Sequence, residues 1–144
     1  MLITREVDYA MRILRALSNG EQMTAQSISD LHQVPKPFAY KIIKKLSRAG
    51  LVSITRGAEG GCSLSADLEQ VTLYDLMRAM EEDFQVIACM EPDYDCTWRD
   101  TNGECIVHCE LAGLQRQLDQ ELRSRTLHSL IFGRNGPAGN APTL

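Results

Sequence analysis

A short glycine-rich link between two extended segments is the feature that most constrains the fold of this chain. The link spans residues 56–61 and contains Gly57, Gly60 and Gly61. Glycine adopts the positive φ angles that tight turns need, so residues 51–55 and 62–65 are predicted to pair as a β-hairpin. When three helices precede such a hairpin, the pattern is typical of a winged helix-turn-helix.

Apolar residues at helical spacing predict those three helices. The first begins at Thr4 as its N-cap and continues to Leu17, and the second runs from Thr24 through Leu31. The third occupies residues 35–46, where two prolines suit the first turn, and Gly50 stops it. The helices are short and closely spaced, as a helix-turn-helix requires.

The charge of the chain is divided between its two halves. Residues 1–61 hold nine Lys/Arg and five Asp/Glu, a net charge of +4, whereas residues 62–144 hold six and fourteen, a net charge of −8. Residues 35–56 contain six basic residues and no acidic one. Binding to DNA phosphates needs a local basic face and not a basic protein, so the overall charge of −4 is compatible with DNA binding.

The third helix and the hairpin therefore carry the candidate DNA contacts. The N-terminal part of such a helix enters the major groove, and a basic residue beside the hairpin can reach a minor groove. The alternative is an ordinary solvated helix face. The candidate DNA-binding residues are Lys36, Pro37, Tyr40, Lys41, Lys44, Arg56 and Gly57.

The second half of the chain is predicted to be helical around an irregular segment. Thr72 and Asp75 form a capping-box pattern that announces a fourth helix. Residues 89–104 are predicted to be irregular. A long helix is predicted over about residues 104–125, with a last short helix from Thr126. The apolar positions of the long helix follow a spacing close to a heptad: Val107, Leu111, Leu114, Leu118 and Leu122.

Four of the five cysteines fall within 21 residues, which suggests metal or redox chemistry. Thiolates bind iron and zinc well, and an iron–sulphur cluster typically takes four protein ligands. Cys89, Cys96 and Cys105 lie on a segment that can bend around one centre, while His108 and Cys109 share a helical face with Cys105.

The surroundings of the loop cysteines favour a metal site over a free nucleophilic thiol. Acidic neighbours raise thiol pKa values, whereas a bound metal deprotonates the thiols. A structural zinc site and a thiol or disulfide switch without metal are the alternatives, although the spacing is not the paired C-x-x-C of zinc ribbons. Cys62 is predicted to be a small buried side chain.

Several classes of protein are disfavoured by the sequence. No apolar run approaches the roughly 18 residues of a membrane span, and the N-terminus lacks the apolar stretch of a signal peptide, so we expect a cytoplasmic protein with no membrane partner. The histidines are scattered, and no nucleophile elbow or phosphate-binding glycine loop is present. We therefore expect no enzymatic activity.

Residues 1–132 resemble the BadM/IscR-type (Rrf) family of winged-helix transcription regulators. The resemblance rests on short motifs spread along the chain together with the three loop cysteines. These motifs are residues 8–10 in the first helix, residues 49–52, 56–57 and 60–61 around the hairpin, residues 72–75 and residues 126–127.

The resemblance implies a homodimer that pairs through the long helix and binds a pseudo-palindromic operator, with repression as the commoner outcome. It further implies an iron–sulphur cluster held by Cys89, Cys96 and Cys105. His108 matches the fourth ligand of the 2Fe–2S branch, whereas Asp8 matches that of the 4Fe–4S branch, in which the partner subunit supplies it. Cys109 is an additional thiol that offers a further alternative.

The predicted fold is thus mainly α with a small β-hairpin wing. We expect a winged helix-turn-helix over residues 1–66, dimerisation helices over residues 67–132 with a cluster-binding loop at 89–109, and a flexible tail over 133–144. The predicted function is a DNA-binding regulator that senses iron–sulphur status, redox state or nitric oxide. The alternatives are a zinc- or thiol-switch regulator and an interaction module without a cluster.

Overall fold

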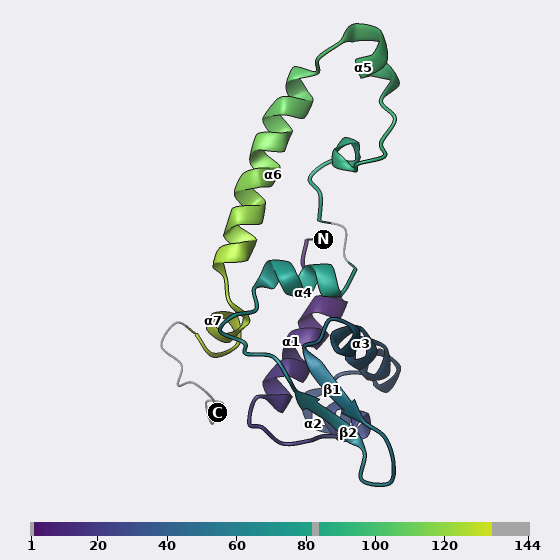
Figure 1. Ribbon diagram of the computed structural model, residues 1–144, viewed down its shortest axis with the longest axis vertical. Helices are drawn as coiled ribbons and strands as arrows, with labels where there is room; N and C mark the ends of the chain where they lie inside the picture. The colour runs from purple at the N-terminus through teal and green to yellow at the C-terminus, as the bar shows by residue number, and fades with distance from the viewer. Residues whose placement is uncertain (1, 82–83, 134–144) are drawn as a thin grey trace.

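A helical body carries a long projecting arm in the computed structural model, which describes residues 2–81 and 84–133 (Figure 1). The arm consists of one long helix and the segment that runs back beside it. The elements in chain order are α1 (Arg5–Leu17), α2 (Ala25–His32), α3 (Lys36–Arg48), β1 (Val52–Thr55), β2 (Gly61–Leu64), α4 (Leu73–Ala79), the 3-10 helix η1 (Ala88–Met90), α5 (Thr97–Asn102), α6 (Ile106–Ser124) and α7 (Leu127–Phe132).

The three helices of the body begin and end where local sequence signals predict. The Thr4 hydroxyl accepts a hydrogen bond from the backbone N–H of Val7 at the start of α1. The Thr24 hydroxyl caps α2 in the same way, at 3.0 Å from the N of Ser27. These hydroxyls satisfy donors that the first turn of a helix leaves unpaired. Gly50 has a φ of 75° directly after α3, as a left-handed helix stop requires.

The predicted hairpin is confirmed, although β1 begins one residue later than predicted and β2 begins and ends one residue earlier. β1 and β2 pair antiparallel, with Val52 opposite Leu64. Met23 adds a short bridge beyond β2, where two backbone hydrogen bonds of 2.8 and 2.9 Å join it to Cys62. A Cβ atom at Gly61 would lie 2.7 Å from the Met23 carbonyl oxygen, so this close approach requires glycine.

The hydrophobic core lies in the body and extends to α4, α7 and, through Leu122, the end of α6. It forms where the apolar faces of α1, α2 and α3 meet the hairpin, because burial of those faces is the main force that drives folding. The largest fully buried side chains are Ile13, Leu14, Leu17, Ile28, Ile42, Leu46, Leu76, Met77, Met80, Leu127, Val7 and Val34.

The start of α4 is joined to the link between α6 and α7. Thr72 and Asp75 form the predicted capping box, with each side chain bonded to the other residue's backbone N–H. The backbone N–H of Leu73 donates to the carbonyl of Arg125, and that of Leu127 donates to the carbonyl of Val71, both at 2.8 Å. These bonds form the joint where the arm leaves the body.

The segment predicted to be irregular over residues 89–104 contains two short helical pieces, so that prediction is wrong. η1 begins at Ala88, and α5 occupies Thr97–Asn102. The backbone N–H of Asp100 donates to the carbonyl of Cys96 at 3.1 Å, which closes the turn that opens α5. Gly103, with a φ of 81°, ends α5 and leads the chain into α6. Local backbone hydrogen bonds thus form short helices in a segment whose acidic residues, glycine and proline had suggested an irregular loop.

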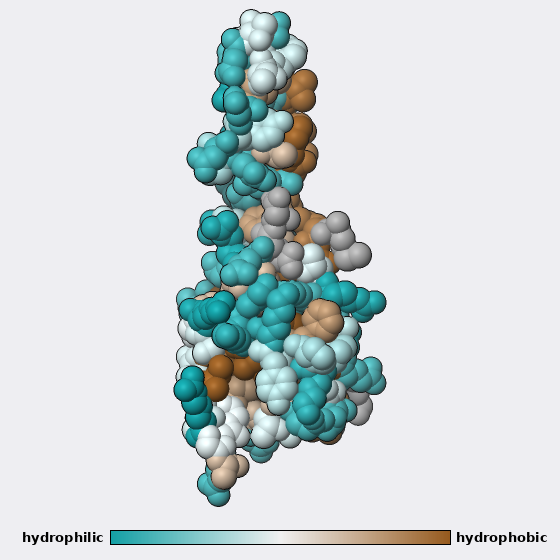
Figure 2. Space-filling view, turned by 90° about the vertical axis from the view of Figure 1, so that its right-hand side faces the viewer, coloured by the Kyte–Doolittle hydropathy of each residue, from teal (hydrophilic) through white to brown (hydrophobic). Residues whose placement is uncertain are grey.

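The long helix is confirmed, although it begins two residues later than predicted. Cys105 is the N-cap of α6, and Leu122 is the one buried residue within Ile106–Ser124. Ile106 is 76% exposed, and Leu114 is exposed by about half. Figure 2 shows apolar side chains along one edge of the narrow arm. Of the apolar positions of α6, Leu122 joins the core and Leu118 packs against it, whereas those nearer the start of the helix stay largely outside the core.

No helix within residues 2–81 and 84–133 is both long enough and apolar enough to span a membrane. Most of the predicted tail over 133–144 lies outside the described residues. Gly133 follows the end of α7 with a φ of 80°.

Candidate DNA-binding face and cysteine site

The exposed face of α3 carries the predicted DNA contacts. Ala39, Ile42 and Leu46 turn into the core. Ile43 is buried as well, and the helical period turns the opposite side of α3 toward solvent. As predicted, the exposed residues include Lys36, Pro37, Tyr40, Lys41 and Lys44.

The two lysines Lys41 and Lys45 share one acidic partner, which the sequence does not reveal. One oxygen of the Glu6 carboxylate accepts a hydrogen bond from Lys41, and the other accepts one from Lys45 at 2.8 Å. Lys45 also donates to the carbonyl of Met80 at 2.8 Å and lies 3.5 Å from Glu81. Lys45 thus links α3 to α1 and to the end of α4, whereas Lys41 is paired but exposed.

The shared acid and the inner lysine favour each other's charged form. Burial acts to raise the pKa of Glu6, but hydrogen bonds from Lys41 and Lys45 outweigh it and hold that pKa below its usual value. Burial likewise acts to lower the pKa of Lys45, and the hydrogen bond with Glu6 outweighs it and raises that pKa. The group is therefore ionised at neutral pH.

Phe38 is an exposed aromatic residue of α3 that the sequence reasoning missed. Its ring meets the edge of Tyr9 with the centroids 5.6 Å apart, and the guanidinium of Arg12 lies 5.8 Å from the Tyr9 ring. An edge-on aromatic pair contributes about 0.5–1.5 kcal/mol beyond its buried area. The contact fixes the start of α3 against α1. The signal available in the sequence was an aromatic residue beside Pro37 in the first turn of the helix.

The tip of the hairpin is closed by its own backbone. Arg56 and Gly57 are exposed, and Gly57 has a φ of 115°. The backbone N–H of Gly60 donates to the carbonyl of Gly57 at 3.0 Å, and a Cβ atom at Gly60 would lie 2.5 Å from the oxygen of Thr55. The glycines permit a tight turn that leaves Arg56 projecting into solvent.

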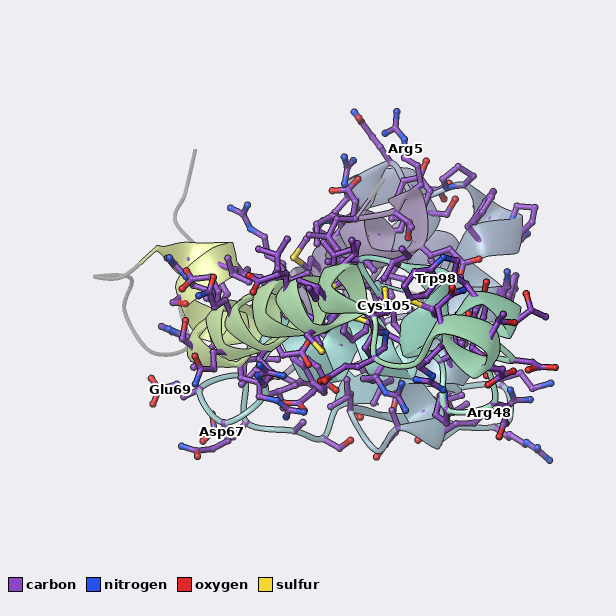
Figure 3. All side chains as sticks on the ribbon, turned by 90° about the horizontal axis from the view of Figure 1, so that it is seen from above. Arg5, Arg48, Asp67, Glu69, Trp98 and Cys105 are labelled. Atoms are coloured by element: carbon purple, nitrogen blue, oxygen red, sulfur yellow. The ribbon has the colours of Figure 1, made fainter. Side chains whose placement is uncertain are left out.

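Two predicted ligands, Cys89 and His108, are in side-chain contact near the start of α6, and a third, Cys105, is the N-cap of that helix. The Sγ of Cys89, on η1, is 3.3 Å from Nδ1 of His108. The backbone N–H of His108 donates to the Sγ of Cys105 at 3.4 Å. The arm thus brings together residues from its two sides, with Cys105 at the projecting end of α6 (Figure 3).

Cys96 is not part of this group. It is the N-cap of α5, the helix that carries the exposed Trp98 labelled in Figure 3. Within residues 2–81 and 84–133, no three Cys, His, Asp or Glu side chains are arranged as a metal site. The donor types fit an iron–sulphur cluster, since thiolates and imidazole are its usual protein ligands. The four predicted cluster ligands do not converge on one centre.

The two alternative fourth ligands are engaged elsewhere. The exposed Cys109 thiol donates to a carboxylate oxygen of Glu104 at 3.5 Å, and this hydrogen bond raises the pKa of the thiol. A raised pKa disfavours the thiolate that a metal requires. Asp8 lies on α1 in an ion pair with Arg12, at 3.0 Å.

Cys62 is buried, as predicted for a small core side chain. Its thiol donates to the carbonyl of Met23 at 3.3 Å. Burial raises the pKa of the thiol, so Cys62 stays protonated at neutral pH.

The profile of the Rrf2 family, described as "Iron-dependent Transcriptional regulator", matches residues 3–133. The chain belongs to the Rrf2 family. Members of this family are transcription regulators that bind DNA, and no enzymatic family is indicated for this Rrf2 protein. The predicted family and the predicted winged-helix fold are therefore confirmed.

The chain is also similar to individual Rrf2 proteins over most of its length. It is 30% identical to protein aau3 of Rhizobium meliloti over 137 residues, which cover 93% of this chain and 87% of that protein. It is 28% identical to the HTH-type transcriptional regulator NsrR of Bacillus subtilis over 125 residues, which cover 85% of this chain and 80% of NsrR.

Two solved structures share the fold. CymR, the global cysteine regulator of B. subtilis, superposes with a TM-score of 0.63 and 22% identity, covering 90% of this chain and 95% of CymR. IscR of T. potens superposes with a TM-score of 0.61 and 20% identity, covering 90% of this chain and 85% of IscR. At these identities the likeness concerns the fold alone.

Proposed function

We propose that this Rrf2 regulator is a homodimeric repressor whose DNA binding is controlled by an iron–sulphur cluster. Cys89, Cys96 and Cys105 supply three ligands, and His108 supplies the fourth. The signal is a change in iron–sulphur status, redox state or nitric oxide that alters the cluster. The observation that carries the proposal is the contact of Cys89 with His108 at the start of α6, where Cys105 is the N-cap of the helix.

The contacts of the candidate residues favour His108 over Cys109 and Asp8 as the fourth ligand. Its Nδ1 atom lies 3.3 Å from the Sγ of Cys89, whereas Cys109 is bonded to Glu104 and Asp8 is paired with Arg12. A bound cluster supplies a redox-sensitive centre whose loss removes the cross-link between its ligands. The protein's own part is to bring Cys96, at the start of α5, toward the pair on η1 and α6.

The proposed dimer explains the apolar surface of α6. Contiguous apolar patches of large extent are uncommon on monomers and mark interaction surfaces. A second copy of α6 would cover this surface and fix the spacing of the two α3 helices, which must meet successive major grooves of an operator. The exposed apolar residues of the arm include Trp98, Ile106, Val107 and Leu114.

The DNA-reading part of the proposal rests on the faces of α3 and the hairpin. Lys36 and Lys44 are exposed on α3, and Arg56 projects beside the turn. Lysine and arginine neutralise phosphates, and arginine can also enter a narrow minor groove. Tyr40, exposed on the same helix, is placed to contact bases or the backbone.

Anaerobic purification tests the cluster directly. We expect a coloured protein that contains iron and acid-labile sulphide, and whose operator affinity changes when the cluster is removed. Cys96→Ala should abolish cluster retention while leaving the helical circular dichroism unchanged. Cys109→Ala is the matched control and should retain the cluster, because Cys109 is bonded to Glu104 and lies outside the proposed ligand set.

Two results would contradict the proposal. A colourless, iron-free protein with full operator affinity would remove the cluster from the function. Full iron content in Cys96→Ala would remove Cys96 from the ligand set. His108→Ala tests the fourth ligand, because loss of the cluster in this variant but not in Asp8→Ala would select His108.

A thiol switch without metal is the second candidate, and one contact favours it. The Cys89 Sγ and the His108 Nδ1 are 3.3 Å apart, so the thiol has a hydrogen-bond partner and lies on the partly exposed arm, where an oxidant can reach it. This candidate predicts a metal-free protein whose operator affinity responds to oxidants and is restored by a thiol reductant. A zinc-bound protein would instead be colourless and would contain zinc.

A further inference from the structure

The carboxylate of Glu6 lies between two lysines of α3 that differ strongly in exposure. Its side chain is 16% exposed, whereas the side chains of Lys45 and Lys41 are 12% and 56% exposed. The carboxylate and the inner lysine are thus confined by the protein. The outer lysine has the freedom to exchange one partner for another.

Several contacts hold Glu6 and Lys45 in place. Glu6 lies in the first turn of α1, where the helix dipole favours a negative charge. Lys45 donates at 2.8 Å both to Glu6 and to the carbonyl of Met80, which is itself buried. This arrangement crosses from α1 through α3 to the end of α4, which lie together in the body (Figure 1).

Lys41 faces a choice between two anions. It is exposed on the face of α3 that we have proposed to meet DNA, and its ammonium group is bonded to Glu6. One ammonium cannot neutralise a carboxylate and a phosphate to the full extent at the same time. Glu6 is therefore placed to compete with the DNA backbone for Lys41.

We propose that Glu6 acts as a charge gate that withholds Lys41 from DNA phosphates, and that Lys45 ties this gate to the end of α4. The inference rests on the proposed DNA contact by α3. It assigns to Glu6 a part in setting operator affinity, although an acid is repelled by phosphates. It is a positioning residue that acts through Lys41.

The end of α4 is a suitable place from which to adjust the gate. Lys45 is bonded to Met80 and lies 3.5 Å from Glu81, just before the chain continues toward Phe84 and the cysteine segment. A shift of this end relative to α3 would move Lys45, and Glu6 would follow its inner partner. The ion pair between Glu6 and Lys41 would then strengthen or weaken without any movement of the hairpin.

A double-mutant cycle with Glu6→Gln and Lys41→Met tests the gate in the full chain. Binding to duplex DNA of unrelated sequence is measured across a range of salt concentrations. Glu6→Gln should bind about two- to fivefold more tightly, the range expected when Lys41, whose side chain is 56% exposed, loses its ion pair. Its salt dependence should become steeper by up to about 0.9 in log–log slope, which corresponds to one phosphate contact. In the Lys41→Met background, Glu6→Gln should have no effect.

Asp30→Asn is the matched control for the loss of one negative charge. Asp30 is an exposed acid of α2 whose partner is Gln26, at 2.8 Å, and not a lysine. If Asp30→Asn tightens binding as much as Glu6→Gln, or if Glu6→Gln still tightens binding without Lys41, the gate is wrong and the effect is one of net charge. A lower melting temperature with unchanged affinity would make Glu6 a packing residue and would equally overturn the gate.

The part played by Lys45 is tested by Lys45→Met with thermal unfolding as a check on the fold. Without Lys45, Glu6 has Lys41 as its remaining lysine partner, so DNA binding should weaken, and Glu6→Gln in the same chain should reverse the loss. Failure of the reversal would overturn the link through Lys45. If the wild-type protein shows no salt-dependent DNA binding, the proposed function fails as well. If it binds DNA normally but the double-mutant cycle shows no coupling between Glu6 and Lys41, the gate alone is overturned.

Discussion

The body and the arm of this protein use their apolar residues in opposite ways. In the body, the inner faces of α1 and α3 supply side chains that are completely buried, such as Leu14 and Leu46. In the arm, α5 has no buried residue within Thr97–Asn102, and the apolar residues near the start of α6 lie in solvent. Both regions contain apolar residues, but those of the body form a core and many of those of the arm stay exposed.

This difference indicates that the body and the arm are stabilised by different interactions. Burial of apolar surface contributes about 25 cal/mol per Å², and the body gains it from its own residues. The arm gains little of it within one chain, so its form depends on helix propensity, on the Cys89–His108 contact and on whatever covers α6. A region of this kind responds readily to a ligand or a partner, because few contacts must be broken when it rearranges.

The largest expected effect is the contrast between Leu46→Ala in the body and Leu114→Ala in the arm. Leu46 is fully buried, so its truncation should cost about 2–5 kcal/mol in the free energy of unfolding. Leu114 is 51% exposed, and its truncation should cost less than about 1 kcal/mol within one chain. Urea denaturation followed by circular dichroism measures both values.

Repeating the urea experiment at several protein concentrations sharpens the contrast. A cost for Leu114→Ala that grows with concentration would place Leu114 in the proposed dimer interface. Equal costs at every concentration would mean that the arm is packed as tightly as the body, and the contrast would be lost.

An intermediate effect is expected for DNA binding, which we assign to the body. Arg56→Ala should weaken operator binding by about 1–3 kcal/mol if the hairpin reads a groove. Arg116, an exposed arginine of α6, is the matched control, and Arg116→Ala should leave the affinity nearly unchanged. Fluorescence anisotropy at fixed salt concentration measures both. Unchanged affinity in Arg56→Ala would remove the hairpin from DNA reading.

The smallest effect is expected at the joint between the two regions. Thr72→Ala removes the hydroxyl that accepts from the backbone N–H of Asp75, and should destabilise the protein by about 1 kcal/mol. Thr126→Ala removes the equivalent cap of α7, where the N of Ser129 lies 3.2 Å from the hydroxyl. Thermal unfolding of the two variants compares them. Negligible shifts in both would show that backbone bonds alone hold the joint.

Much of the body could be predicted from local sequence signals. Thr4, Thr24 and Thr72 cap helices because their hydroxyls satisfy the free backbone donors of the first turn, which requires only nearby residues. The glycines of residues 57–61 predicted a tight turn for a similarly local reason. The exposed positions of α3 followed from helical periodicity.

The segment before α6 was harder to predict because its signals conflict. Its acidic residues, Pro92 and Gly103 indicated an irregular loop, yet α5 forms at Thr97–Asn102. The cysteine spacing named the candidate ligands but not their grouping. Which of them meet depends on how η1 folds back against α6, a contact between residues 19 positions apart in the case of Cys89 and His108.

The sequence by itself determined the helix starts, the wing and the chemistry available for a metal, since each depends on neighbouring residues or on residue type. Only the tertiary structure decided that Glu6 faces Lys45, which lies 39 positions along the chain, and that Lys45 reaches the end of α4. The physical reason is that such pairs form when packed helices bring their side chains within hydrogen-bonding distance, and no local pattern encodes that approach. The connection between the proposed DNA-binding face and the rest of the molecule therefore becomes visible in the folded chain.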